Sequence, residues 1–347
     1  MKIIPHSLPT LGAREAAAAA RAVRSGLAEG KEAAAFEAAA ARFLGLHGGA
    51  AVNSGTTALA LGLKALGAGP GKEVILPAYA RTALFQAVRM TGAEPVAADV
   101  HWHDMNLSVA QARRRMTHRT AAVVAVHGFG ASVELEPLLK LGIPLVEELS
   151  QALGAVDYNR RKLGTFGAFA VLSFSASGLL STGQGGMVLS SDRRILDAVR
   201  DLRACGDRPA AVLRLDAGMT EAQAAVGSVQ LSRLPSFLAA RRRWADRYRE
   251  ALLGTPWEAP LQIYGRVYGR FVVKSPRTIT DALLASFEKA GAAVVRPVRR
   301  PLHWDLPGAG AFPVAERVWR RSLSLPIYPL LREEAFRRVL HALKNAA

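Results

Sequence analysis

Residues suited to bind a phosphate lie in the turn after a short apolar segment, residues 50–52. The segment runs into Asn53–Thr57, which is rich in small and hydroxylated residues, and a helical pattern follows. Glycine lets the backbone approach a ligand closely, and the free N–H groups and hydroxyls of a helix N-terminus suit an anion. An ordinary tight turn between a strand and a helix explains the same residues equally well.

The elements that would position this turn alternate along the chain. Short apolar strands are expected at residues 50–52, 74–76, 95–99, 121–126, 144–148, 169–174 and 186–190. Helical patterns are expected at residues 11–25, 31–44, 58–66, 82–91, 109–116, 193–202, 220–234 and 235–253. This order predicts an α/β fold with a mainly parallel sheet covered by helices on both faces. Because ligands of such sheets bind at the carboxyl ends of strands, one site is expected at the turns after Val52, Leu76, Val126 and Glu148.

The pattern changes after Pro256. Two short strands, at residues 267–273 and 293–295, and helices at 281–290 and 332–343 indicate a small α+β unit. A chain of 347 residues is long for one core. We therefore predict a large domain over residues 1–240, which includes the N-terminal arm, and a small C-terminal α+β domain over residues 241–347.

The formal net charge is +17, from 45 basic and 28 acidic residues. The densest basic runs, at residues 113–115, 241–243 and 320–321, lie in stretches with helical periodicity, and no nucleic-acid recognition motif accompanies them. Solvated helix faces explain such runs better than a nucleic-acid surface does. A basic protein also suits small anions such as nucleotide sugars.

The expected location is the cytoplasm, without a membrane span. The single cysteine, Cys205, cannot form an intramolecular disulfide, which fits a reducing compartment. Met1–Pro5 lacks the apolar stretch of a signal peptide. No uncharged apolar segment reaches the ~18–20 residues that a membrane span needs.

Several segments together resemble the DegT/StrS-type sugar aminotransferases, which are pyridoxal-phosphate (PLP) enzymes of fold type I. The matching segments, in family order, are Asn53–Leu59, Gly69–Pro77, Val146–Ala152, Gly164–Gly167, Ser173–Phe174, Thr182–Val188, Thr220–Gly227 and Leu323–Pro326. Any one of them is a weak signal, whereas all of them in register identify the family. The resemblance implies a dimer with sites across its two-fold interface, and a nucleotide-sugar ligand.

The resemblance also implies a cofactor site. Gly55, Thr56 and Ser173 would hold the phosphate of PLP, although Ser173 could instead be a buried strand serine satisfied by the backbone. Glu148 stands where the family usually has Asp, which pairs with the pyridine nitrogen. Glutamate is one methylene longer, a shift of ~1 Å that matters in a packed site. Gln151 matches the residue that contacts the ring hydroxyl. No metal is implied.

Five other residues are weaker candidates. His127 follows a strand and fits the family pattern, but a histidine satisfied by its neighbours at a sheet edge is an equal explanation. Trp102, His103, His303 and Trp304 are candidates for lining a sugar site, and ordinary loop and core aromatics explain them at least as well.

The family pattern breaks at its catalytic lysine. The family has Ser-Phe, three variable residues and then Lys, and here Gly178 stands five residues after Ser173. The lysine amine forms the Schiff base with PLP and moves the proton on the substrate carbon. Glycine can do neither. Some relatives have a histidine at this position and catalyse a dehydration, and glycine cannot take that role either. Lys140 and Lys162 are the nearest lysines in sequence, and by resemblance Lys162 falls outside the pocket.

Three more positions depart from the family. Arg81 stands where an aromatic residue stacks on the ring, with Tyr79 as the alternative if the loop shifts. Asp216 and Gly218 replace an Asn and an Arg, and that Asn reaches the phosphate across the dimer interface. A carboxylate beside a phosphate repels it. We also predict that Arg81 and Glu148 pair inside the vacated ring site, because a buried charge needs a partner.

Together these losses favour a degenerate transaminase that acts as a non-catalytic partner or binding protein. We expect a homodimer or a heterodimer with an active paralogue, with PLP not covalently bound or absent. The alternative is a working PLP enzyme on a keto- or amino-sugar, with a non-covalent cofactor or a lysine from elsewhere. A basic nucleic-acid binder is the least supported hypothesis.

Overall fold

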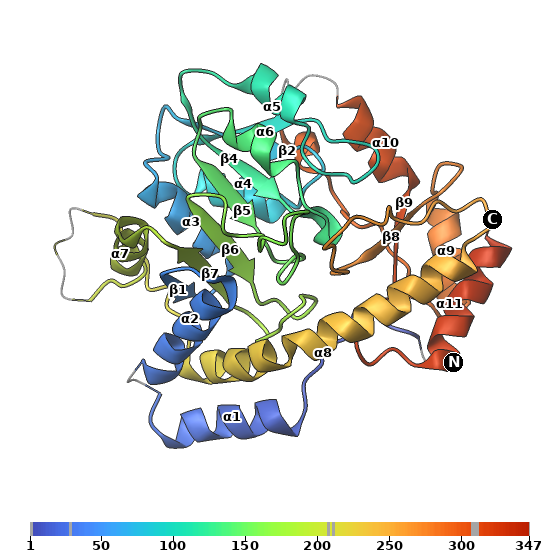
Figure 1. The fold of residues 1–347 in the computed structure, drawn as a ribbon, viewed down its shortest axis with the longest axis horizontal. Coiled ribbons are helices and arrows are strands. Elements are labelled where there is room, and N and C mark those ends of the chain that lie inside the picture. The colour runs from blue at the N-terminus through green and yellow to red at the C-terminus, as the bar shows by residue number, and fades with distance from the viewer. Residues whose placement is uncertain (1–2, 28–29, 207–208, 210–211, 307–311, 347) are drawn as a thin grey trace.

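The computed structural model describes residues 3–27, 30–206, 209, 212–306 and 312–346 (Figure 1). Among these residues the large sheet has seven strands. In spatial order they are β1 (Gly48–Val52), β7 (Gly186–Ser190), β6 (Phe169–Ser173), β5 (Leu145–Glu148), β4 (Thr120–Val126), β2 (Glu73–Pro77) and β3 (Glu94–Ala98). β7 is antiparallel to both of its neighbours, and the other pairs are parallel. The predicted α/β fold with a mainly parallel sheet is confirmed.

Alternation of side chains along the strands builds an apolar layer on each face of this sheet. In β2, Val74 and Leu76 pack in one layer and Ile75 packs in the other. The first layer includes residues of α3 (Gly55–Ala65), α4 (Thr82–Arg89) and α7 (Arg193–Leu202). The second includes residues of α2 (Lys31–Leu44), α5 (Val109–Arg115), α6 (Leu135–Leu139) and the first half of α8 (Glu221–Ala251). Burial on both faces explains why the strands read as continuous apolar runs.

The helix α8 corrects the prediction of two helices at residues 220–234 and 235–253, because it continues through Pro235 (Figure 1). Proline removes one hydrogen bond from a helix interior. Here the two halves are held in line by packing: Leu234 and Phe237 lie in a layer of the large sheet, and Tyr248 lies in the core of the C-terminal unit. Helix α1 (Ala13–Arg24) packs along the first half. Tertiary contacts override local propensity at this position.

The C-terminal unit has its own small sheet and core. β8 (Phe271–Lys274) and β9 (Ser322–Leu325) pair antiparallel. The remaining elements are η1 (Gly128–Gly130) in the large domain and α9 (Asp281–Lys289), η2 (Leu302–Asp305), α10 (Pro313–Arg321) and α11 (Glu333–Asn345) in the C-terminal unit. The predicted boundary after residue 240 falls inside α8, and Ile4 of the N-terminal arm pairs with Ala292. The two units therefore share a helix and an N-terminal strap.

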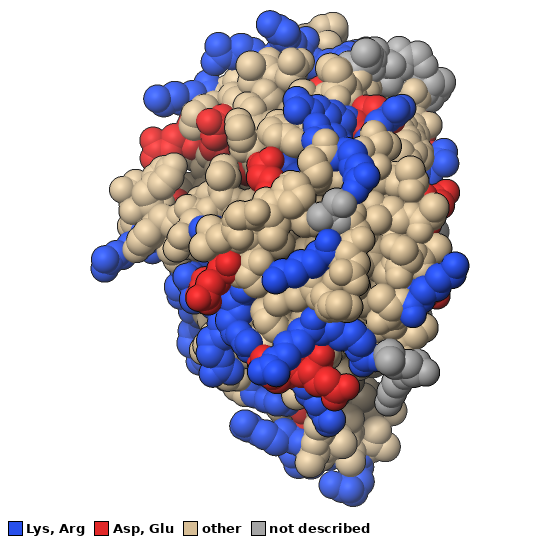
Figure 2. Space-filling model, turned by 90° about the vertical axis from the view of Figure 1, so that its right-hand side faces the viewer, with Lys and Arg blue, Asp and Glu red and all other residues tan. Residues whose placement is uncertain are grey.

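Basic side chains are distributed among uncharged and acidic ones on the face shown in Figure 2. The prediction that the basic runs are solvated helix faces is wrong for Arg241 and confirmed for Arg320. Arg241 is 3% exposed and donates to the carbonyl of Ile327 at 2.8 Å. Arg320 pairs with Glu316 at 2.7 Å. In the part of the chain that the structure describes, no helix is long and apolar enough to cross a membrane.

Candidate functional site

The carboxyl end of β1 and the start of α3 border a cavity of about 190 Å³, which we call the cradle. Ser54 caps α3, and its Oγ accepts a hydrogen bond from the Thr57 N–H at 3.1 Å. At Gly55 a Cβ would lie 2.5 Å from the Cβ of Ser173, so only glycine allows this approach of α3 to β6. Gly55, Thr56 and Ser173 all line the cradle. The structure thus brings together the residues that the sequence assigns to a phosphate, at a helix N-terminus.

Arg81 and Glu148 both line the cradle and form an ion pair there, as predicted. Nη2 of Arg81 lies 3.9 Å from Oε1 of Glu148. The Glu148 side chain is 5% exposed and also accepts a hydrogen bond from the Ser150 N–H at 3.1 Å, whereas the Arg81 side chain is 39% exposed. A long, partly solvated ion pair of this kind contributes no more than about 1 kcal/mol. Its main effect is to give the buried carboxylate a partner.

Arg81 also lines two smaller cavities, of about 30 and 20 Å³. A cavity of that size holds one or two water molecules. Gln151 lines both, and its Oε1 accepts a hydrogen bond from the Phe129 N–H at 3.1 Å. The predicted ring-contacting amide is thus engaged with the loop after β4. Glu148 lines the larger of the two small cavities as well as the cradle.

Gly178 lies in a tight turn of the loop between β6 and β7. Its N–H donates to the carbonyl of Ser175 at 2.9 Å. A Cβ at Gly178 would lie 2.8 Å from the carbonyl oxygen of Leu180 and 3.2 Å from that of Ser175. Any side chain at this position therefore requires the backbone to shift.

No lysine is found among the described residues that line the cradle or the two smaller cavities. Lys162 lies elsewhere: its Nζ donates to the carbonyl of Phe43 and lies 5.1 Å from the centre of that ring. Lys140 lines none of the three cavities either. None of the described lysines therefore supplies an amine to these three cavities of its own chain.

His127 is fully buried, and its ring contacts Glu147 of the neighbouring strand β5. Its Nε2 lies 3.0 Å from Oε2 of Glu147, and its Nδ1 accepts from the Val133 N–H at 3.3 Å. Glu147 also accepts from three backbone N–H groups, of Gly164, Phe166 and Gly167. Burial alone would raise the pKa of Glu147, but these hydrogen bonds, with that from His127 the strongest, hold it below its usual value. Both ring nitrogens of His127 therefore have partners within the fold, as the alternative to a site residue predicted.

Asp216 and Gly218 do not reach the cavities of their own chain. Asp216 is exposed and lines none of the three. Gly218 pairs with Val52 at the end of β1, and the Asn53 N–H donates to the carbonyl of Ala217 at 2.8 Å. The segment runs beside the phosphate turn without entering the cradle. Asp216 therefore takes no part in lining these cavities of its own chain.

The four aromatic candidates for a sugar site lie outside these cavities. The ring of Trp102 is covered by cations, with Arg317 at 4.2 Å and Lys274 at 4.8 Å from its centre. His303 is nearly buried and contacts the carbonyl of Ala78 at 3.3 Å. The remaining two, His103 and Trp304, are exposed.

Two residues at the cavities had no place in the sequence-based site. Arg270 precedes β8 and lines the smallest cavity with Arg81. Burial, and then the charge of Arg81, lower the pKa of Arg270 to about 10. Ser150 lines the same cavity, and its buried Oγ has no hydrogen-bond partner among the described residues. Ser150 lies in the matched segment Val146–Ala152, so the family resemblance could have indicated it as a site residue. Arg270 lies in none of the matched segments, and no sequence motif around it indicates a site.

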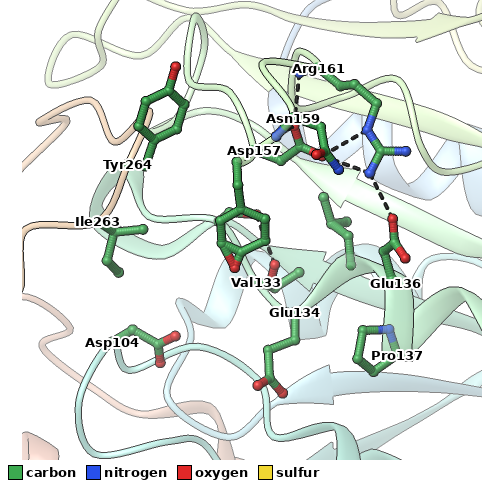
Figure 3. A pocket seen from close by; sticks show the side chains of 13 residues that line it. Asp104, Val133, Glu134, Glu136, Pro137, Asp157, Asn159, Arg161, Ile263 and Tyr264 are labelled. Carbon is green, nitrogen blue, oxygen red and sulfur yellow. Dashed lines mark hydrogen bonds and ion pairs between the residues drawn. The ribbon is translucent and has the colours of Figure 1, made fainter.

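A larger cavity, of about 730 Å³, is lined by a different set of residues (Figure 3). Four carboxylates line it, and Arg161 neutralises two of them: its Nε donates to Asp157 at 2.8 Å and its Nη2 to Glu136 at 2.9 Å. None of the predicted site residues lines it. Among the described residues, no group of three or more His, Cys, Asp or Glu could hold a metal ion.

Comparison with known proteins agrees with this architecture. The model of the DegT/DnrJ/EryC1/StrS aminotransferase family matches residues 9–344. A GDP-perosamine synthase of Caulobacter vibrioides is 33% identical over 328 residues, which cover 89% of this chain and 88% of that protein. Among solved structures, the aminotransferase TlmJ of Streptoalloteichus hindustanus has a TM-score of 0.93 at 30% identity, covering 99% of this chain and 98% of that one. DesV of S. venezuelae, solved with a ketimine intermediate, has a TM-score of 0.88 at 32% identity, covering 98% of each chain. The two solved neighbours are fold-type-I aminotransferases. The present chain belongs to the DegT/DnrJ/EryC1/StrS aminotransferase family.

Proposed function

We propose that this protein is a degenerate homologue of the nucleotide-sugar aminotransferases of polysaccharide or antibiotic-sugar biosynthesis, and that it acts as a non-catalytic partner or binding protein. The observation that carries the proposal is Gly178 at the lysine position, in a turn where a Cβ would lie 2.8 Å from a carbonyl oxygen. PLP-dependent transamination needs an amine there to form the Schiff base and to move a proton.

The residues present suit one half of the cofactor and not the other. Gly55, Thr56 and Ser173 at the start of α3 suit a phosphate. The ring half does not fit, because Arg81 replaces the aromatic residue on which the family stacks the ring, and it pairs at 3.9 Å with Glu148, the carboxylate that the pyridine nitrogen would need. When bound, PLP supplies an electron sink. This chain would hold its phosphate without supplying the group that moves a proton at the substrate carbon.

The proposed assembly is a homodimer or a heterodimer with an active paralogue. Asp216 is exposed beside the phosphate turn and does not enter the cradle of its own chain, which supports a position facing a second chain. Sites built across a two-fold interface make pairing with an intact relative a natural role for a chain without a lysine. The free Cys205 suits a reducing cytoplasm.

The retained cradle favours one second candidate, a working PLP enzyme on a keto- or amino-sugar. Such an enzyme would hold the cofactor non-covalently or borrow a lysine from a partner. It predicts a yellow protein, or a spectral change when an amino donor is added.

Purification with excess PLP and glutamate, followed by visible absorbance and borohydride reduction, separates these two candidates. We expect a colourless protein without a pyridoxyl adduct, whereas an intact relative treated in parallel should be yellow and trapped. A pyridoxyl adduct on any lysine of this chain would overturn the proposal. A change in the PLP spectrum without an adduct would favour the non-covalent enzyme.

A further inference from the structure

A cavity of about 460 Å³ lies between α9 and α11 in the C-terminal unit, and we call it the α9–α11 cavity. The two helices contact each other and lie side by side at one edge of the molecule (Figure 1). Three basic side chains, Lys289, Arg338 and His341, line the cavity, and none of the described lining residues is a carboxylate. The cavity shares no lining residue with the cradle. It is therefore a separate hollow with a local excess of positive charge.

Arg338 is half-buried, and none of its N–H donors is used within the described structure. Its Nε is buried without a hydrogen-bond partner, and its guanidinium forms no ion pair with a described carboxylate. The next residue differs in both respects, because Arg337 is exposed and pairs with Glu333 at 2.9 Å. A partly desolvated guanidinium without acceptors costs free energy. An anion in the cavity would supply the acceptors that Arg338 lacks.

The other two basic side chains are also available to a ligand. Lys289, at the end of α9, is exposed and makes no hydrogen bond or ion pair with a described residue. Nδ2 of Asn345 lies 3.0 Å from Nε2 of His341, and because an amide nitrogen can only donate, the Nδ1–H of His341 is left as a free donor. Lys289 and Arg338 each add a full positive charge. Together they match a phosphate monoester, which carries a charge of about −1.5 to −2 near neutral pH.

We infer that the α9–α11 cavity binds a small organic phosphate, with its phosphate group between Arg338 and Lys289. The planar guanidinium of arginine suits two oxygens of a phosphate at once, and the ammonium of lysine adds a point charge. The volume of about 460 Å³ leaves room for an organic body beside the phosphate, since small-molecule sites typically measure about 300–1,000 Å³.

The lining also indicates what the organic body is. Ala290, Ala342 and Ala346 line the cavity with small apolar surfaces, and no aromatic side chain is among its described lining residues. The site thus has no ring on which a base or another flat aromatic group would stack. An aliphatic body such as a sugar fits this lining. The inference goes beyond the proposed function, because it concerns a cavity that the residues around Gly178 do not line.

Calorimetric titration of the protein, dialysed free of phosphate, tests the inference. We expect glucose 6-phosphate to bind, inorganic phosphate to bind more weakly, and glucose not to bind. Arg338→Gln should weaken glucose 6-phosphate binding at least about tenfold, because charge-assisted hydrogen bonds are lost. Arg337→Gln is the matched control. It removes the same charge from the neighbouring position, where Arg337 pairs with Glu333 at the surface, and should change binding by less than about twofold.

Ser173→Ala separates this cavity from the cradle, which Ser173 lines, and should change glucose 6-phosphate binding by less than about twofold. A loss of binding in Ser173→Ala together with unchanged binding in Arg338→Gln would place the ligand in the cradle and overturn the inference. Equal losses in the two arginine variants would mean non-specific attraction to a basic protein and would overturn it too. The same holds if glucose 6-phosphate does not bind, or if citrate, which carries only carboxylates, binds as tightly.

Two further measurements guard against a variant that merely unfolds. Arg338→Gln removes a guanidinium that has no described partner, so its melting temperature should be at least that of the parent. In the parent protein, glucose 6-phosphate should slow hydrogen exchange in peptides from α9 and α11. Protection confined to peptides from α3 would contradict the assignment to this cavity.

Discussion

Replacing Gly178 by alanine should destabilise the protein by about 1–2 kcal/mol. The added Cβ would lie 2.8 Å from the carbonyl oxygen of Leu180 and 3.2 Å from that of Ser175, and the first distance is shorter than real Cβ atoms show. Overpacking costs about 1–3 kcal/mol. The lower part of that range applies because Ala176 and Ser177 are exposed and leave the loop free to adjust on one side. Urea unfolding should show a lower midpoint with an unchanged slope.

Ser177→Ala is the control for this prediction. Ser177 precedes Gly178 and is exposed, so its substitution should change the free energy of unfolding by less than about 0.5 kcal/mol. If Gly178→Ala is as stable as the parent, the turn does not exclude a side chain and the steric reasoning is refuted. Gly178→Lys extends the test. We expect at least the same loss of stability and no borohydride-trapped adduct, because Arg81 would still pair with Glu148, the proposed partner of the ring nitrogen. A trapped adduct would locate the loss of chemistry at this one residue.

Three other substitutions test the packing and hydrogen bonds that hold the strands and helices around the site. The pKa of Glu147 is held below its usual value, so its ionised form stabilises the fold above about pH 4.3 and this stability is lost as the pH falls further. Glu147→Gln should therefore lower the urea midpoint near neutral pH and bring parent and variant closer in strong acid; an equal gap at both pH values would contradict this. Gly55→Ala, with its Cβ 2.5 Å from that of Ser173, should cost about 1–3 kcal/mol, and an unchanged melting temperature would speak against the close approach. Pro235→Ala should stabilise the protein by about 1–2 kcal/mol, because it restores an N–H to an exposed position inside α8. A lower melting temperature in calorimetry would instead mean that the proline holds a bend on which the packing depends.

The strands and the turn between β1 and α3 could be predicted because both depend on local order. Apolar runs such as residues 121–126 have one favourable place, inside a sheet covered on both faces. Gly55 was recognisable as part of a motif, although its neighbour Ser173 is more than a hundred positions away. The pairing of Arg81 with Glu148 followed from a rule about buried charge, once the family had placed both residues in one pocket.

Other features could not be read locally. Pro235 signals a break to any local rule, and the helix continues because apolar residues on both sides of it are buried in two different cores. His127 and Trp102 were equally compatible with a site and with a packed frame. The structure shows that both pack within the fold: His127 pairs with Glu147, and the ring of Trp102 is covered by Lys274 and Arg317.

The sequence by itself determined the family, the α/β alternation and the absence of an amine at Gly178, because these depend only on which residue follows which. The tertiary structure alone decided that the turn around Gly178 closes on carbonyl oxygens, that Arg270 comes to lie near Arg81, and that no described lysine lines the cavities. The physical reason is distance along the chain. Arg270 and Arg81 line one cavity although they are far apart in the sequence, because burial of apolar surface brings distant segments together. No local pattern encodes which charges will then be neighbours.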